Sequence, residues 1–173
     1  MDTILTWAPA VLGTTSDRWL GLTAALPGEL LARPAAPGEW SALDCLQHLV
    51  DTERIVFPAR IRHLLAGEDF PNFDPDSQGT APDGNLSAAA LAQSFAAMRG
   101  ESMALLATLT VADLERRSRH SELGVVSMRE LLHEWAGHDL MHTVQAERAL
   151  MQPFIAGCGP WKGYFADHIA GGN

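Results

Sequence analysis

Apolar residues recur every three or four positions along four stretches of the chain, which is the spacing of an amphipathic helix. The stretches cover residues 3–26, 41–66, 87–108 and 127–151. Prolines and glycines separate them, for example at Pro27-Gly28 and at Pro153. The pattern predicts an all-α protein, built as a four-helix bundle with at least one long connecting loop.

Polar residues at the predicted helix starts support these boundaries. Ser41 precedes the second helix with Asp44 three residues on, and Ser127 precedes the fourth with Glu130 at the same spacing. At this spacing the hydroxyl and the acidic side chain can each bond a free backbone N–H of the first turn. Pro58 falls inside the second helix and removes one backbone hydrogen bond there. We therefore expect a local kink within one continuous helix.

The connecting segments differ in how much structure they predict. Residues 67–86 are rich in Pro, Gly and Asp and predict a loop that is either a long crossover or a functional flap. Residues 109–126 are mixed, with a short turn or hairpin expected over 119–126. The tail from 154 to 173 is rich in glycine and aromatic residues.

The composition limits the classes of protein that fit. The 173 residues, 47% hydrophobic and 19% charged, suit one domain with a sizeable core, expected to span residues 1–173. A formal net charge of -9 without a basic run argues against nucleic acid or an anionic membrane as the partner. No signal-peptide pattern follows Met1, and no uncharged stretch approaches membrane-spanning length. With only two cysteines, Cys45 and Cys158, we expect a cytoplasmic protein with reduced thiols, as a monomer or a homodimer.

Three polar residues occupy the apolar side of the fourth predicted helix. His138, His142 and Gln145 fall where a bundle core favours Leu or Ile. The two histidines are four residues apart, so their side chains leave the helix only about 40° apart. Burying each of these groups costs roughly 1–3 kcal/mol unless the group is bonded. A transition metal is one such partner, and a hydrogen-bonded core histidine is the alternative.

His48 is the candidate for a third ligand from another helix. If the second and fourth helices are antiparallel, residue 48 lies about 10 Å from their shared end, and residues 142 and 138 about 13 and 20 Å from it. A parallel pair matches less well, with residues 138 and 142 at about 16 and 22 Å. The helical wheel places His48 beside Thr52 at the border of the polar side, so spacing alone does not select it.

The sequence around these histidines resembles the DinB/YfiT-like superfamily. The early motif is the Trp40-Ser41 entry into a helix followed by His48, and the late motif is His138-x3-His142-x2-Gln145. The resemblance implies an up-down-down-up bundle with long connecting loops, in which His48, His138 and His142 bind a divalent metal. The superfamily contains bacterial thiol S-transferases, a thiol-dependent isomerase and many members of unknown activity. The resemblance therefore indicates the site more closely than the reaction.

Three histidine ligands would leave a coordination position open, which is typical of catalytic and not of structural zinc sites. We therefore expect a metal-dependent enzyme, with zinc or nickel, that activates a small thiol for S-transfer or water for hydrolysis. Its partners would be a small-molecule substrate and a low-molecular-weight thiol. The alternative is a non-enzymatic helical-bundle scaffold or stress-related protein with a structural or vestigial metal site.

Several neighbouring residues are candidates for supporting roles. Glu134, four residues before His138, could accept from a ligand histidine or act as a base, and a solvent-facing charge is the alternative. Gln145 and Asp139 could orient a ligand or a bound water, and for Gln145 a bridge between helices is the alternative. Cys45 lies three residues before His48 and could offer a thiolate, although a lone helical cysteine is more often a small buried hydrophobe.

Two further sets of contacts follow from the pattern. Glu53 falls on an apolar stripe and is expected to pair with Arg60 or Arg99. The 67–86 loop and the tail are the two segments able to cover the end of the bundle that holds the proposed site. Their aromatic residues are expected to shape a pocket there; these are Phe70, Phe73, Trp161, Tyr164 and Phe165.

Overall fold

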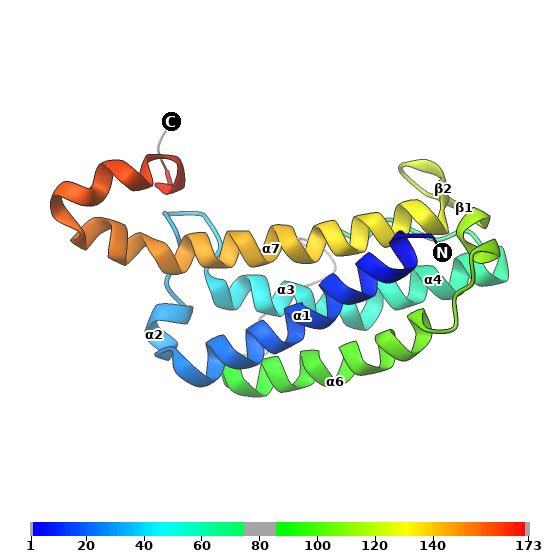
Figure 1. The fold of residues 1–173 in the computed structure, drawn as a ribbon, viewed down its shortest axis with the longest axis horizontal. Coiled ribbons are helices and arrows are strands. Elements are labelled where there is room, and N and C mark those ends of the chain that lie inside the picture. Colours follow the sequence, from blue (N-terminus) through cyan, green and yellow to red (C-terminus); the bar gives the residue numbers. More distant parts are fainter. Residues whose placement is uncertain (1, 75–85, 172–173) are drawn as a thin grey trace.

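The computed structural model describes residues 2–74 and 86–171, and long helices dominate it (Figure 1). These helices are α1 Ile4–Ala25, α3 Ala42–Ile55, α4 Phe57–Ala66, α6 Ala88–Leu106 and α7 Met128–Gly157. Because α4 continues the course of α3, the five helices form the four columns of a bundle. No helix of the described part is long and apolar enough to cross a membrane.

The order and direction of the columns define the topology. α1 and α7 both begin at the end of the bundle where α4 and α6 finish (Figure 1). α1 and α7 therefore run one way, and α3–α4 and α6 run the other. α1 packs against α6 and α7, and α3 packs against the same two helices, so α1 and α3 occupy opposite corners. This confirms the expected up-down-down-up four-helix bundle.

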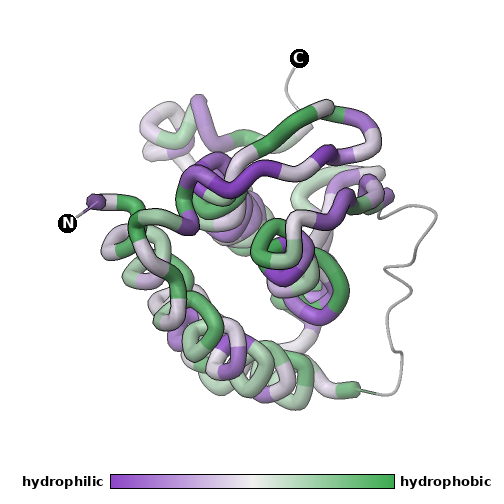
Figure 2. The backbone as a smooth tube through the Cα atoms, turned by 90° about the vertical axis from the view of Figure 1, so that its right-hand side faces the viewer, coloured by the Kyte–Doolittle hydropathy of each residue, from purple (hydrophilic) through white to green (hydrophobic). Residues whose placement is uncertain are grey.

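The core consists of two clusters of buried apolar side chains, one toward each end of the bundle. Leu12, Phe57 and Trp135 belong to the cluster near the start of α7. Trp19 and Phe95 belong to the cluster at the other end. Viewed along the bundle, hydrophobic and hydrophilic segments alternate along the helical turns (Figure 2), in keeping with the periodicity of the sequence.

The second predicted helix is interrupted at Val56, where φ is -110° and ψ is -77°, so one kinked helix is replaced by α3 and α4. Pro58 has no N–H to offer the carbonyl of Arg54, which weakens the helix at this point. Val56 still donates to Thr52 over 3.0 Å, and Arg60 donates to Val56 over 2.9 Å. The interruption is therefore confined to one residue and the column continues.

α7 runs to Gly157, so the predicted end near residue 151 is wrong. Pro153 removes only the hydrogen bond to the carbonyl of Ala149. Ile155, beyond the proline, is 2% exposed, so apolar packing holds the last turn in helical form. The chain then turns at Gly159, whose φ is +57°, into the short 3-10 helix η2 Gly159–His168.

A small antiparallel hairpin stands where the sequence predicted a turn or hairpin. Its strands are β1 Arg117–His120 and β2 Gly124–Ser127, preceded by the 3-10 helix η1 Ala112–Glu115. Phe70 donates to Arg119 and accepts from Ser121, at 3.0 and 3.1 Å. These bonds attach the segment after α4 to the hairpin, and the hairpin contacts α7 through β2. A four-residue helix, α2 Gly28–Leu31, was not expected from the pattern.

Candidate metal centre

Three histidines from two antiparallel helices converge inside the bundle. His48 comes from α3, and His138 and His142 come from α7. One potential ligand atom from each lies within 4.8 Å of the other two. The Nε2 atoms of His48 and His138 are 3.0 Å apart. The structure thus brings together the three residues that the sequence motifs singled out.

Helix geometry explains this convergence. The four-residue spacing on α7 puts His138 and His142 on the same side, with their ring centroids 4.5 Å apart. The antiparallel direction of α3 then brings His48 level with them, with centroids 5.0 Å from His138 and 4.5 Å from His142. The neighbours of His48 on its own helix do not reveal this, because its position depends on how α3 packs against α7.

Aromatic rings enclose the imidazoles. Trp40 stacks on His142, with centroids 5.6 Å apart and planes 18° apart. Phe57 meets His138 edge-on at 5.0 Å. His48 and His142 are buried, at 5% and 6% exposure. This packing fixes the rings and keeps most water away from them.

Burial sets the protonation state of the histidines. Burial, together with the smaller effect of the neighbouring His142, lowers the pKa of His48 to about 4 and that of His138 to about 3. The pKa of His142 is also lowered by burial, although Gln145 and Asp139 oppose the change. All three imidazoles are therefore neutral at pH 7, which is the form that binds a metal ion.

Gln145 fixes the orientation of His142. The Nδ1 of His142 and the Oε1 of Gln145 are 2.9 Å apart. An amide oxygen only accepts, so the imidazole donates from Nδ1 and its Nε2 lone pair is left free. Gln145 thus contacts one of the candidate ligand histidines. That it holds His142 in place for a metal ion is a proposal.

The free nitrogen atoms of the cluster fit a divalent ion. The Nδ1 atoms of His48 and His138 are buried and have no hydrogen-bond partner within the described residues. Their Nε2 atoms face each other as neutral imidazole nitrogens, an arrangement that a cation between them would satisfy. No carboxylate or thiolate of the described ranges joins the cluster. Cys45 is buried away from it, and burial raises the pKa of its thiol to about 12.

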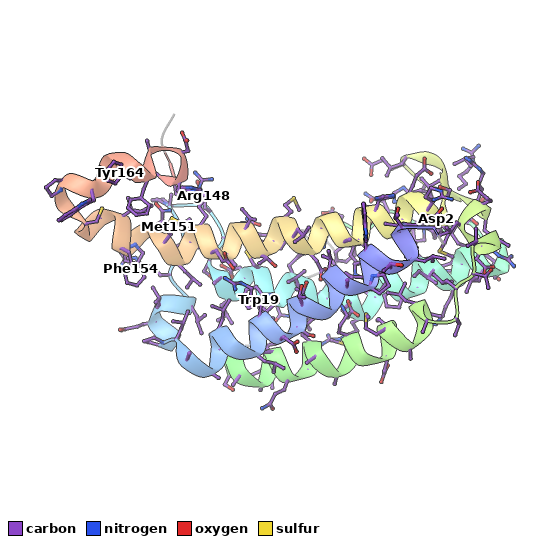
Figure 3. The ribbon with its side chains drawn as sticks, viewed as in Figure 1. Asp2, Trp19, Arg148, Met151, Phe154 and Tyr164 are labelled. Atoms are coloured by element: carbon purple, nitrogen blue, oxygen red, sulfur yellow. The ribbon has the colours of Figure 1, made fainter. Side chains whose placement is uncertain are left out.

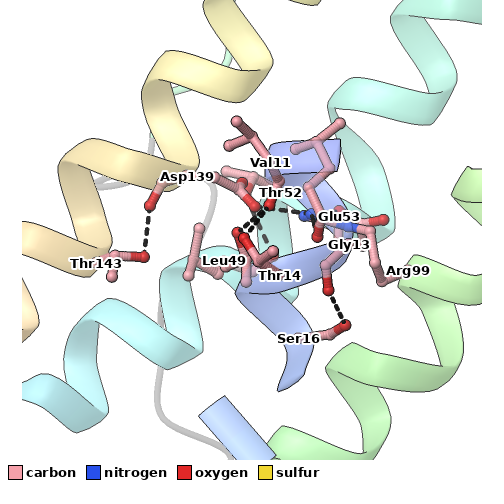
Figure 4. Close-up of polar contacts among 12 residues, drawn as sticks. Val11, Gly13, Thr14, Ser16, Leu49, Thr52, Glu53, Arg99, Asp139 and Thr143 are labelled. Atoms are coloured by element: carbon pink, nitrogen blue, oxygen red, sulfur yellow. Dashed lines mark hydrogen bonds and ion pairs between the residues drawn. The ribbon is translucent and has the colours of Figure 1, made fainter. Parts of the chain in front are cut away.

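A buried ion network lies beside the histidines. Arg99 of α6 donates to Glu53 of α3 and to Asp139 of α7, both over 2.7 Å (Figure 4). It also donates to the carbonyl of Leu12 in α1 over 2.8 Å. Glu53 thus pairs with Arg99 and not with Arg60. Asp139 binds the same arginine, a role that the sequence did not indicate because the contact depends on how α6 and α7 lie in the packed core.

A pocket of about 360 Å³ opens onto the three histidines. Its apolar walls include Phe57, Phe73, Leu123 and Met141, so the expected contribution of the 67–86 loop is present in Phe73 and absent for Phe70, which does not line this pocket. Glu134 also lines it, and although this side chain keeps contact with solvent, the surrounding protein raises its pKa. Residues 75–85 of the loop lie outside the described part of the chain.

The expected contribution of the tail to this pocket is wrong. Trp161 and Tyr164 are 63% and 85% exposed, and Phe165 lies in η2, none of whose residues is buried. Because α7 continues through Pro153, it carries the tail past the end of the bundle, away from the start of α7 (Figure 3). Arg148 holds the tail there by donating to the carbonyl of Ile169 over 2.8 Å.

The fold and the site define a class of protein: an up-down-down-up helical bundle with a three-histidine cluster between its second and fourth columns. A family model described as the DinB superfamily matches residues 12–146, and the chain belongs to this superfamily. Among solved structures, the fold is similar to that of YfiT from Bacillus subtilis, described as a probable metal-dependent hydrolase with an unusual four-helix bundle topology. The TM-score is 0.73 at 18% sequence identity, over 87% of each chain. No curated protein sequence matches this chain.

Proposed function

We propose that His48, His138 and His142 bind a divalent metal ion, zinc or nickel, and that the protein is a metal-dependent enzyme acting on a small molecule. One observation carries the proposal: three neutral imidazoles place their ligand atoms within 4.8 Å of one another at an open pocket. The similar fold of YfiT, described as a probable metal-dependent hydrolase, supports it. An ion held by three protein ligands would lower the pKa of a bound water or thiol and stabilise the resulting anion.

The side chains around the cluster have separable tasks in this proposal. Gln145 holds His142 in the tautomer that leaves Nε2 free. Trp40 and Phe57 keep the rings in place and exclude bulk water. Glu134 lines the same pocket and is the carboxylate placed to accept a proton from the attacking water or thiol.

The pocket admits two kinds of reaction. Hydrolysis needs only water as the nucleophile, and the description of YfiT favours it. S-transfer needs a low-molecular-weight thiol, which the superfamily resemblance suggests. The open, partly apolar pocket argues against the alternative of a purely structural site, since such sites are usually closed by four protein ligands.

Metal content tests the binding site directly. Protein purified without a histidine tag should contain close to one equivalent of zinc or nickel by elemental analysis. His142→Ala should remove most of it, because one of three ligands is lost. His133→Ala is the matched control, since His133 is an exposed histidine of the same helix, and it should keep the metal. Full occupancy in His142→Ala would show that the three-histidine site is wrong.

Turnover tests the enzymatic part of the proposal. Metal-loaded protein should hydrolyse an activated ester or couple a small thiol to an electrophile, and the thiol dependence of the rate separates the two reactions. His48→Ala should abolish turnover while leaving the helical circular dichroism unchanged. If metal-loaded wild type shows neither activity and a metal-bound structure shows the ion sealed from solvent, the enzymatic proposal fails and the scaffold interpretation stands.

A further inference from the structure

His120 has a fixed hydrogen-bonding pattern on the wall of the pocket. The backbone N–H groups of Glu122 and Leu123 both donate to its Nδ1, each over 3.2 Å. Backbone N–H groups cannot accept, so Nδ1 carries a lone pair and the single ring proton is on Nε2. Burial and the nearby Arg60 lower the pKa of His120, which is consistent with this neutral form.

The Nε2–H group of His120 faces another donor. Nη2 of Arg60 lies 3.2 Å from Nε2 of His120. A guanidinium has no lone pair to accept with, so these two groups cannot bond to each other. A single acceptor group lying beside both donors would satisfy the two of them together.

Arg60 is also without a close ion pair in the part of the chain that the structure describes. The side chain is half-buried, and no carboxylate of the described residues forms an ion pair with it. It lies over the ring of Phe70 at 5.6 Å, a contact in which its N–H groups do not act as hydrogen-bond donors. Burial lowers the pKa of Arg60 and the charge of nearby Glu134 opposes this change, and the arginine stays charged at neutral pH.

We propose that Arg60 and His120 form a binding subsite for the carboxylate group of a small organic ligand. A carboxylate offers two oxygens that accept from neighbouring donors, and arginine binds it through charge-assisted hydrogen bonds. Arg60 lies in α4 and His120 in β1, and the two residues are 60 positions apart in the sequence, so only the folded chain forms the subsite.

The subsite and the three histidines share one pocket. Arg60, His120 and the histidine cluster all line the same cavity of about 360 Å³. Apolar side chains such as Phe73 and Leu123 lie on its walls, which suits the hydrocarbon body of a small ligand. Given the metal-dependent activity proposed above, the carboxylate would be held at one side while the reacting group faces the histidines. Binding of the carboxylate itself does not depend on that activity.

Glu134 opposes an anion in the same pocket. It is the nearby acidic group that interacts electrostatically with Arg60, without forming an ion pair. Its negative charge weakens binding of an anion to Arg60, so Glu134→Gln should tighten carboxylate binding. A variant that only disturbed the fold would weaken carboxylate binding. Tighter binding by Glu134→Gln would therefore be specific to the charge that it removes.

Benzoate and its neutral isostere benzamide are suitable probes, with affinity measured by isothermal titration calorimetry. Wild type should bind benzoate at least about tenfold more tightly than benzamide, because only benzoate offers a charged acceptor. Arg60→Gln should remove this preference. Arg62→Gln is the matched control, because it loses the same charge from an exposed position of the same helix, and it should keep the preference. Equal losses in both variants, or no preference in wild type, would overturn the subsite.

A second variant, at His120, separates the proposed hydrogen bond from its Nε2–H group to the ligand from the bonds that its Nδ1 accepts in the hairpin turn. Asparagine can still accept from the turn in place of Nδ1 but has no group at the position of Nε2. His120→Asn should therefore fold, as judged by circular dichroism and melting temperature, and should weaken benzoate binding by a few-fold or more. Unchanged benzoate affinity in a folded His120→Asn protein would exclude His120 from the subsite.

The measurements are made on protein both stripped of metal and loaded with zinc. Benzoate binding by the metal-free protein, with the expected variant pattern, supports the subsite even if no enzymatic activity is found. Binding that needs zinc and is insensitive to Arg60→Gln would place the carboxylate on the ion and overturn the subsite, while leaving the metal site intact. The two proposals therefore fail in different experiments.

Discussion

At the scale of single residues, Arg99 joins the four columns of the bundle at one point. Its guanidinium binds Glu53, Asp139 and the carbonyl of Leu12, and its Cζ lies over the rings of Phe95 and Trp135, 4.8 and 5.5 Å from their centroids. Two carboxylates share this one cation with almost no access to solvent. Removing a single member of such a group leaves the others buried without compensation. The network therefore connects all four columns, and through Asp139 it reaches the position next to His138.

Replacement of Arg99 tests this interpretation. Arg99→Met should destabilise the protein by about 3–5 kcal/mol, because Glu53 and Asp139 are left facing each other without a cation. For a chain of this length the melting temperature should fall by roughly 6–20 °C. Thermal unfolding followed by circular dichroism measures the change.

Two controls accompany that measurement. Arg18→Met breaks an exposed ion pair with Glu147 and should cost no more than about 1 kcal/mol. Adding Glu53→Gln and Asp139→Asn to Arg99→Met should recover part of the loss, since the unpaired charges are removed. A loss from Arg99→Met no larger than that from Arg18→Met would show that the network does not hold the bundle together.

At the scale of elements, the interruption at Val56 divides one column into two functional parts. α3 carries His48 toward α7, and α4 carries Arg60 toward the hairpin. The hairpin presents His120 to the same pocket, and its bonds to Phe70 hold the loop segment that contains Phe73. Elements that look like connections in the sequence thus build one wall of the pocket, while the regular helices α3 and α7 build the other.

At the scale of the whole molecule, the bundle has a core that does not depend on a metal. Two clusters of buried apolar side chains extend along the bundle on either side of Arg99. A chain of this size buries enough apolar surface to fold without a bound ion. An ion held by the histidines should therefore add to stability without being required for folding.

Chelation tests this separation between stability and metal binding. A ligand at a hundredfold excess over its Kd stabilises the folded state by about 2.7 kcal/mol. Removing the metal with a chelator should lower the melting temperature by several degrees while the helical circular dichroism at 25 °C is retained. His142→Ala should melt at the lower temperature with or without chelator. Complete unfolding of wild type in chelator would indicate a structural metal instead.

The sequence by itself determined the features that depend on local patterns. Periodicity located the helices, and the boxes at Ser41 and Ser127 fixed two starts, where both reciprocal bonds are present. The four-residue spacing placed His138 and His142 on one side of a helix, because the helical turn alone sets that relation. Turn-forming residues located the hairpin within two residues of its observed start.

Only the tertiary structure decided which side chains from different elements meet. Glu53 had two candidate partners and binds Arg99. Arg60 meets His120 instead, and the tail lies away from the pocket because packing beyond Pro153 keeps α7 helical. Local sequence patterns specify the type of secondary structure and which side of each helix is buried. The register and crossing of packed helices result from the whole core at once, so contacts such as that between His48 and His138 become certain only in the folded chain.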